Sequence, residues 1–329
     1  MPTLTAPNQI REAKSRAQTR EYSAFGGILR SEIEFPELTA VAPSSRPDWT
    51  VSIDSSDRSL PALTLVGERV VGEEVYRLFS FAGGWRLAYS HGGTFDISSD
   101  GAAIIWHHDD AARPELVRSI ILGPAISLAL ELTGFFCLHG SAVVIAETAI
   151  AFVGPKHFGK STLATALTTA GAKLIGDDLL VVRPGAPAMV RPGIGSVRLW
   201  PDMAAVLPLA GVCNTLIPGI KATATGFVDE ALATTATPLR AIYVLSPVLD
   251  TPSGPVAWRK LLSPIEAAMA LALQTKLPAS LVGLHGAGAQ LAAAAAVAAT
   301  VPVWTLHAIR DVSRMAELVR QVTEWSRVE

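Results

Sequence analysis

Cysteine, aromatic side chains and charge of one sign are all scarce in this sequence. Its 2 cysteines, Cys137 and Cys213, lie far apart without metal-ligand spacing, which excludes a disulfide framework. The net charge is −2, and neither sign forms a long run. This balance excludes the electrostatic footprint of a nucleic-acid or anionic-membrane partner. We therefore predict a cytoplasmic protein with no nucleic-acid or membrane partner.

Long apolar runs are also few. Residues 1–20 are polar and basic, so they predict a flexible tail and no secretory signal. Residues 120–138 are strongly apolar but include Pro124 and Glu131, and residues 286–301 are mostly alanine. We expect buried core helices in both places and no transmembrane span.

Residues 21–112 carry the pattern of a β-rich domain. Alternating apolar and polar residues recur at 49–53, 74–81, 85–90 and 94–98, and glycine pairs separate several of these runs. Short strands at regular spacing predict an antiparallel N-terminal domain. The 329 residues, of which 50% are hydrophobic, suffice for a second domain.

Residues 113–329 alternate helical and extended patterns, which predicts the α/β class. We expect helices at 115–133, 162–170, 203–207, 264–273, 286–299 and 312–325. We expect strands at 136–145, 149–153, 174–175, 179–182, 196–202, 238–245 and 302–306, and a loop at 184–192.

A glycine-rich segment between an expected strand and an expected helix has the spacing of a phosphate-binding loop. It reads glycine, four residues, glycine, lysine, serine. Such a turn points backbone N–H groups and a helix N-terminus at one spot, where a triphosphate binds. Lys160 would reach the outer phosphates and Ser161 would hold Mg²⁺. The predicted nucleotide-binding residues are Gly154, Pro155, Lys156, His157, Phe158, Gly159, Lys160, Ser161 and Thr162.

Two adjacent carboxylates, Asp177 and Asp178, follow the loop helix at the end of an expected strand. Side chains alternate in direction on an extended segment, so only one of the two can face the phosphates directly. That carboxylate could accept a hydroxyl proton or hold Mg²⁺ through water. The alternative is a helix cap or a solvated turn.

Other polar residues are weaker candidates. His139 precedes the loop strand, although a lone histidine is usually structural. Arg198, Lys221 and Arg240 could form a positive second wall around the phosphates, although each is more often a surface or salt-bridge residue.

The order of these motifs resembles the catalytic domain of HPr kinase/phosphorylase, which is related in fold to ATP-dependent phosphoenolpyruvate carboxykinase. The matching positions are His139-Gly140, the loop and Asp177-Asp178. Later positions resemble the stand-alone HPr-kinase-like proteins of lasso-peptide-type biosynthetic clusters: Arg198-Leu-Trp200-Pro201-Asp202, residues 238–245 and Leu262-Ser-Pro264. The resemblance covers residues 115–325 and implies a P-loop kinase domain with a mixed sheet.

The resemblance also implies roles for single residues. Asp177 would be the base toward a serine hydroxyl, with Asp178 supporting it and contributing to the metal site. His139 would lie close to the phosphate being moved, and Arg198 and Lys221 would contact phosphate or acceptor.

The chain departs from the family pattern in two places. Lys156, His157 and Phe158 replace the usual small loop residues, and residues 189–196 contain no glutamate of the family's glycine-rich signature. The resemblance therefore does not extend to the phosphorylase activity or to HPr as the acceptor.

Together these patterns predict a kinase that uses ATP and Mg²⁺ to phosphorylate a hydroxyl, with serine expected, on a peptide or small protein such as a lasso-type precursor. Two alternatives stay open: a kinase of a free small molecule such as an amino acid, and a nucleotide-binding regulatory module without transfer. The sequence also leaves open whether the chain forms a homo-oligomer.

Overall fold

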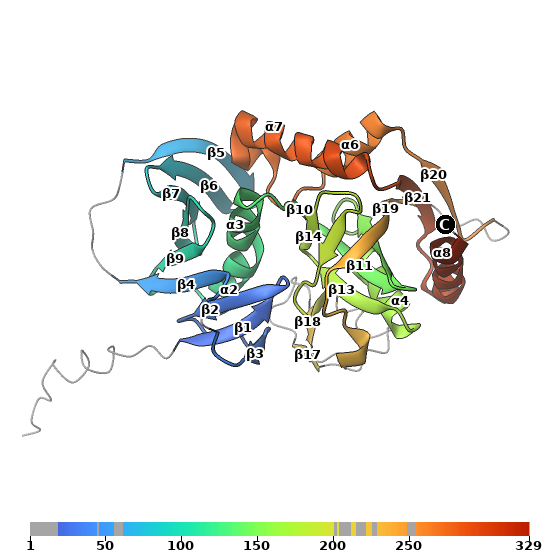
Figure 1. Cartoon of the computed structure of the whole chain (residues 1–329), viewed down its shortest axis with the longest axis horizontal. Helices are drawn as coiled ribbons and strands as arrows, with labels where there is room; N and C mark the ends of the chain where they lie inside the picture. Colours follow the sequence, from blue (N-terminus) through green and yellow to red (C-terminus); the bar gives the residue numbers. More distant parts are fainter. Residues whose placement is uncertain are drawn as a thin grey trace, which may run out of the picture.

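The computed structural model describes residues 19–44, 46–55, 62–200, 203, 212–214, 222–225, 229–248 and 254–328. Residues 1–18 of the predicted tail and most of the predicted helix at 203–207 lie outside the described residues, as does Lys221. The described part is a mixed α/β structure with two nine-stranded sheets (Figure 1).

The first sheet has the strand order β3-β1-β2-β4-β9-β8-β7-β6-β5. Its strands are β1 Arg20–Ala24, β2 Gly27–Ser31, β3 Thr39–Val41, β4 Trp49–Asp54, β5 Thr64–Val71, β6 Glu74–Phe81, β7 Gly84–Tyr89, β8 Gly93–Ser98 and β9 Ala103–His107. The expectation of a purely antiparallel sheet is wrong, because β4 runs parallel to both β2 and β9. No tight turn joins β4 to either neighbour, so no hairpin dictates its direction.

The expected helix at 115–133 is observed with an interruption. It consists of α2 Pro114–Ile120, a π-helical turn η1 Ile121–Ala125, and α3 Ile126–Leu132. Pro124 lies within the π-helical turn, and its ring removes a backbone donor that a regular helix needs. The apolar side of this helix packs in one core with the first sheet, through residues such as Ile121, Leu87 and Phe95. The prediction of a buried core helix is therefore confirmed here.

The second sheet has the order β10-β14-β15-β19-β12-β11-β13, and β21 pairs with β19 and β20. Its strands are β10 Phe136–Leu138, β11 Gly140–Ile145, β12 Thr148–Val153, β13 Lys173–Asp177, β14 Leu180–Arg183, β15 Met189–Arg191, β19 Thr237–Val248, β20 Ala257–Leu261 and β21 Val303–Ile309. The expected strand at 136–145 is divided at His139, and the expected loop at 184–192 contains β15. A strand as short as β15 is too brief to show a periodic pattern.

Helices cover both faces of the second sheet (Figure 1). Helices α4 Lys160–Thr169 and α8 Met315–Val328 pack on one face, through residues such as Leu163 and Val322. Helices α6 Pro264–Ala272 and α7 Ala279–Ala298 pack on the other. A capping box between Ser263 and Glu266 starts α6 at the expected place.

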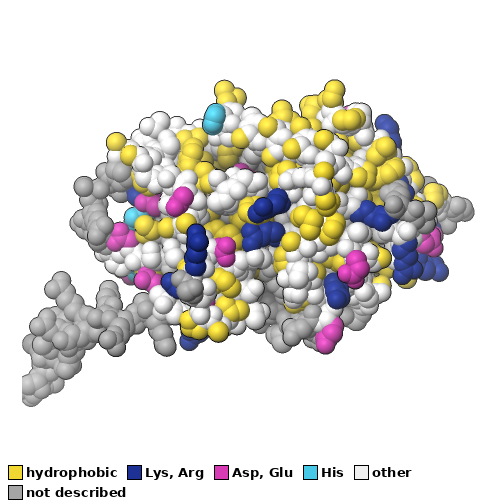
Figure 2. Space-filling model, viewed as in Figure 1, with side chains coloured by type: hydrophobic (Ala, Val, Ile, Leu, Met, Phe, Trp, Pro, Cys, Tyr) yellow, Lys and Arg dark blue, Asp and Glu magenta, His cyan; other side chains and the backbone are white. Residues whose placement is uncertain are grey.

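Helix α7 differs from its expected form. It begins seven residues before position 286, bends at Gly283 (φ 67°), and buries only one side. It is long and apolar enough to cross a membrane, with 28% of its most apolar window buried, so the expectation of a buried core helix is wrong for this segment. Figure 2 shows hydrophobic side chains along this edge of the molecule. The exposed ones on α6, at its C-cap and on α7 are Ile265, Met269, Leu273, Leu284 and Leu291.

A small antiparallel sheet completes the described part, in the order β16-β18-β17. Its strands are β16 Val197–Leu199, β17 Val212–Asn214 and β18 Ala222–Thr225. Strand β16 follows the acidic pair in the chain and brings Arg198 back beside it.

Candidate active site

The glycine-rich segment forms the turn between β12 and α4, as its sequence predicts. Strand β12 is held in the sheet by β11 on one side and β19 on the other. The turn begins at Gly154 (φ 143°) and ends at Gly159 (φ 90°), which is the N-cap of α4. Both φ values lie where side chains are disfavoured, so glycine is required by conformation. The first amides of α4 therefore point out of the sheet edge.

Lys160 lies across this turn. The residue is 7% exposed, and its Nζ donates to the carbonyl oxygens of Gly154 at 2.7 Å and Pro155 at 3.0 Å. Ser161 and Thr162, in the first turn of α4, are half-buried. The turn thus holds one cation and two hydroxyls at a helix N-terminus, which is an arrangement that suits an anionic ligand.

A cavity of about 530 Å³ opens beside the first turn of α4. Its volume falls within the range of small-molecule sites, roughly 300–1,000 Å³. Its walls combine the end of the glycine-rich turn with apolar side chains from β19, β21 and α8, and with the charged residues Lys160, Arg198, Arg310 and Asp311.

The three bulky residues of the turn do not fill this cavity. Lys156 and His157 are exposed, and the His157 ring stacks on Trp200 with centroids 5.0 Å apart. Phe158 is half-buried and packs against the core beneath α4 and α8. The departure from the family pattern at these positions therefore leaves room for a ligand.

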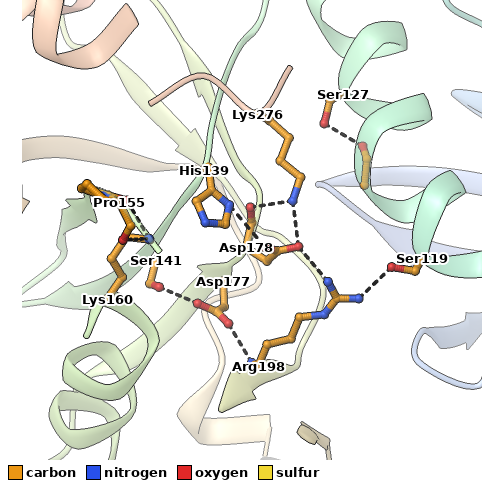
Figure 3. A network of polar contacts seen from close by, with 12 residues as sticks. Ser119, Ser127, His139, Ser141, Pro155, Lys160, Asp177, Asp178, Arg198 and Lys276 are labelled. Atoms are coloured by element: carbon orange, nitrogen blue, oxygen red, sulfur yellow. Dashed lines mark hydrogen bonds and ion pairs between the residues drawn. The ribbon is translucent and has the colours of Figure 1, made fainter. Parts of the chain in front are cut away.

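The two adjacent carboxylates point to different partners (Figure 3). Asp177 is buried at the end of β13, and it accepts hydrogen bonds from Ser141 Oγ and from the backbone N–H of Arg198. Asp178 has a left-handed backbone (φ 67°). Its carboxylate lies 3.3 Å from His139 Nδ1, 2.7 Å from Lys276 Nζ and 3.2 Å from the Arg198 guanidinium. The two side chains diverge, but the expected reason is wrong, because β13 ends at Asp177 and Asp178 is not on an extended segment.

The surroundings of Asp178 set its charge and that of His139. Burial alone would raise the pKa of Asp178, but Lys276, His139 and Arg198 together hold this pKa well below its usual value. Burial lowers the pKa of His139, and the charges of Lys276 and Lys160 lower it further, against the hydrogen bond to Asp178. At neutral pH Asp178 is therefore an anion and His139 is uncharged. We assign the proton of His139 to Nδ1, facing Asp178.

Lys276 reaches this site from a distant part of the chain. The segment after α6 runs antiparallel to β10, with His139 N–H donating to Gln274 O at 2.7 Å and Lys276 N–H donating to Cys137 O at 2.9 Å. Its Nζ also donates to the backbone oxygen of Asp178 at 3.1 Å. No motif in the sequence marks Lys276, and sequence reasoning missed it, as it missed Ser141 and Ser119 as site residues.

Arg198 connects the acidic pair to the helix that follows the first sheet. One guanidinium nitrogen faces Asp178, and the other donates to Ser119 Oγ of α2 at 3.0 Å. A second cavity, of about 70 Å³, lies on this side of the acidic pair. It is lined by Phe25, Glu37, Glu115, Ser119, Leu122, Gly123, Asp177, Asp178, Leu179, Ile194, Ser196 and Arg198.

The structure thus brings most of the predicted site together. His139, the acidic pair and Arg198 are joined by direct contacts, and Lys160 lies on the neighbouring turn (Figure 3). Arg240 lines neither cavity, so the expectation of a phosphate contact is wrong for this residue. Lys221 lies outside the described residues, and its role stays a prediction.

The side chains present fit a magnesium ion held mainly by phosphate. Among the described residues, no group of three or more His, Cys, Asp or Glu side chains could hold a metal. Mg²⁺ in phosphate-transfer sites takes few protein ligands and keeps several waters. Ser161 has a hydroxyl in position for this role. Asp178 would reach the ion through water, because its carboxylate already faces three other groups.

Comparison with known proteins adds little to this geometry. No protein-family model and no curated protein matches the chain. Among solved structures, it is similar to the Hpr(Ser) kinase/phosphatase from Coxiella burnetii, with 13% sequence identity and a TM-score of 0.30. The match covers 58% of this chain and 96% of that one. Similarity of this degree carries no weight for function, which has to be inferred from the site itself.

Proposed function

We propose that this chain is a kinase that transfers the γ-phosphoryl group of ATP, with Mg²⁺, to a hydroxyl group. We expect the acceptor to be a serine side chain. This serine would belong to a peptide or small protein, such as a lasso-type precursor. The observation that carries the proposal is that Arg198 lies in the walls of both cavities. One has the glycine-rich turn in its wall, and the other has both carboxylates of the acidic pair.

In this proposal the nucleotide occupies the cavity of about 530 Å³. The amides of the turn and Lys160 bind the outer phosphates, and the apolar walls from β19, β21 and α8 cover the nucleoside. Mg²⁺, held by Ser161 and by phosphate oxygens, would neutralise charge on the phosphates.

The acceptor hydroxyl approaches from the other cavity. Its oxygen forms a bond to the γ-phosphorus while the bond from that phosphorus to the β-phosphate oxygen breaks, and ADP leaves. Asp177 accepts the hydroxyl proton late in the transfer. A carboxylate offers about four lone-pair sites, so two remain beside the bonds from Ser141 and Arg198. Arg198 lies in the wall of both cavities, where it would stabilise charge on the group in transfer.

Asp178, His139 and Lys276 hold the site in shape. Asp178 fixes the Arg198 guanidinium from one side, and Ser119 fixes it from the other. Uncharged His139 orients the Asp178 carboxylate and faces the loop with its second ring nitrogen. This network of contacts positions Arg198, and because His139 is uncharged it adds no acidic proton beside the phosphates.

The test is incubation of the protein with γ-labelled ATP, Mg²⁺ and a panel of acceptors, followed by mass spectrometry of the products. The panel contains serine peptides and free serine, so it also separates a peptide kinase from an amino-acid kinase. We expect one phosphorylated acceptor and one ADP per transfer. Release of ADP and phosphate without any phosphorylated acceptor would contradict the kinase assignment, and ATP binding without turnover would favour a regulatory module.

A further inference from the structure

We infer that the acceptor presents one small hydroxymethyl group beside a positive charge, and that it enters the cavity of about 70 Å³ next to the acidic pair. The inference rests on the proposed function and adds the chemical class of the acceptor. It follows from the position, the size and the charge of that cavity.

Position decides which substrate enters this cavity. Its wall includes both Asp177 and Asp178, whereas the wall of the larger cavity includes neither. Arg198 is common to both walls. A hydroxyl that gives its proton to Asp177 and receives phosphate beside Arg198 therefore has to come from the smaller cavity.

Size limits the reacting group. A cavity of roughly 150 Å³ holds a benzene ring, and one water needs roughly 10–15 Å³. At about 70 Å³ the cavity has room for a hydroxymethyl or hydroxyethyl group, but not for a phenol ring. Its apolar wall, which includes Phe25, Leu122 and Ile194, suits a short carbon segment. The geometry thus favours serine or threonine over tyrosine.

Charge defines the neighbourhood of the reacting group. Two glutamates, Glu37 and Glu115, join the acidic pair in the cavity wall. Asp178 already faces Lys276 and Arg198, and Glu37 Oε1 is paired with Arg118 at 2.8 Å.

Two carboxylates in this wall have an oxygen to which none of the described residues donates a hydrogen bond. Glu37 Oε2 is buried without a hydrogen-bond partner. The Glu115 side chain is exposed and makes no hydrogen bond or ion pair with the residues that the structure describes, and it lies one helical turn before Ser119 on α2. For Glu37, a buried carboxylate oxygen without a donor is costly, and a bound cation would supply the donor. The wall is therefore complementary to an ammonium or guanidinium group on the acceptor.

Such a positive charge has two sources. It is either the α-ammonium of the acceptor residue itself, as in free serine or an N-terminal serine, or the side chain of a neighbouring lysine or arginine. Both share one chemistry, a cation close to a hydroxymethyl group. An acidic acceptor segment is disfavoured in both cases.

The test uses equal-length peptides that differ in charge beside a central serine. In acetylated peptides the serine has glutamine, lysine or glutamate neighbours. A fourth peptide has tyrosine between lysines, and a fifth has a free N-terminal serine with glutamine neighbours. Binding is measured by calorimetry with Mg²⁺ and a non-hydrolysable ATP analogue, and transfer is measured separately with ATP. We expect the lysine peptide or the free N-terminal serine peptide to bind about tenfold more tightly than the glutamine peptide, as for one charge-assisted hydrogen bond.

Variants assign the preference to this cavity. In Glu115→Gln or Glu37→Gln we expect the charge preference to fall below about threefold, because one carboxylate of the wall is lost. Glu324→Gln, an exposed position on α8 outside both cavity walls, removes the same charge and should keep the full preference.

Equal affinity for the lysine, glutamine, glutamate and free N-terminal serine peptides would overturn the inference, and so would a preference that persists in both variants. Phosphorylation of the tyrosine peptide as fast as the serine peptides would overturn the size argument. A charge preference in binding without transfer to any peptide would leave the inference standing and overturn the proposed kinase activity.

Discussion

The two cavities that share Arg198 in their walls differ in size and in charge. The larger, of about 530 Å³, has the cations Lys160, Arg198 and Arg310 in its wall, with one carboxylate, Asp311. The smaller, of about 70 Å³, has four carboxylates, Glu37, Glu115, Asp177 and Asp178, with the shared Arg198. An anionic donor and a cationic acceptor would each meet the wall that suits it. In the proposed function, the charge of each wall decides which substrate binds there, and Arg198 lies in the wall of both cavities.

The largest effect is expected from a substitution in the wall of the smaller cavity. Asp177→Asn removes the proton acceptor but keeps the size of the side chain, so the rate of transfer should fall by about 10²–10⁴-fold. Single-turnover transfer with saturating MgATP measures this. Asp110→Asn, a fully exposed aspartate outside both cavity walls, is the matched control. Transfer at the wild-type rate in Asp177→Asn would contradict the base assignment.

Arg198, which lies in the walls of both cavities, should have the next largest effect. Arg198→Ala removes the guanidinium that contacts Asp178 and Ser119, and we expect the rate of transfer to fall by about 10²–10³-fold. Arg198→Lys keeps the charge but cannot bridge Asp178 and Ser119 together, so it should restore only part of the loss. Rate constants for the two variants, compared with Arg327→Ala at an exposed site on α8, check this. Full activity in Arg198→Ala would remove Arg198 from the mechanism.

Asp178 should matter for stability as well as for activity. Asp178→Asn leaves Lys276 and Arg198 without their shared anion, which should cost about 3 kcal/mol of unfolding free energy at pH 7. The pKa of Asp178 is held well below its ordinary value in the folded chain, so this stabilisation is complete above about pH 4 and is lost as pH falls toward the folded-state pKa. Denaturant unfolding of both proteins from pH 7 to pH 3 tests the sign. Curves that stay parallel at all pH values would contradict it.

The smallest effect is expected at His139. Its pKa is lowered in the folded chain, so the unfolded chain binds a proton first as pH falls below about 6.5. The wild-type stability should therefore drop with falling pH in that range, by at most about 1.4 kcal/mol per pH unit from this residue. In His139→Gln the slope should be shallower by that contribution. A steeper slope in the variant would show that the folded-state pKa is raised instead.

The residues around the larger cavity could be predicted from the sequence better than those around the smaller cavity. The strand, turn and helix around the glycine-rich segment follow from local pattern, because the motif and its flanking elements are contiguous. The divergence of Asp177 and Asp178 is expected from alternation along a strand, but it arises where the strand ends, because Asp178 has a left-handed backbone.

The rest depends on contacts between distant parts of the chain. Lys276 reaches Asp178 only because the segment after α6 pairs beside β10, and Ser119 reaches Arg198 only because the interrupted helix after the first sheet packs there. The parallel pairing of β4 with β2 and β9 likewise has no local signal. Each of these features is determined by tertiary packing, which a single sequence does not encode in any short window.

The separation of donor and acceptor sides can be tested most directly by titrating MgATP into three proteins: the wild type, Lys160→Ala and Asp177→Asn. We predict that Lys160→Ala weakens MgATP binding by at least about tenfold, because it loses a charge-assisted contact to phosphate. Asp177→Asn should leave the dissociation constant within about threefold of the wild type, because Asp177 lies in the wall of the smaller cavity alone. Equal weakening in both variants, or none in Lys160→Ala, would contradict the account.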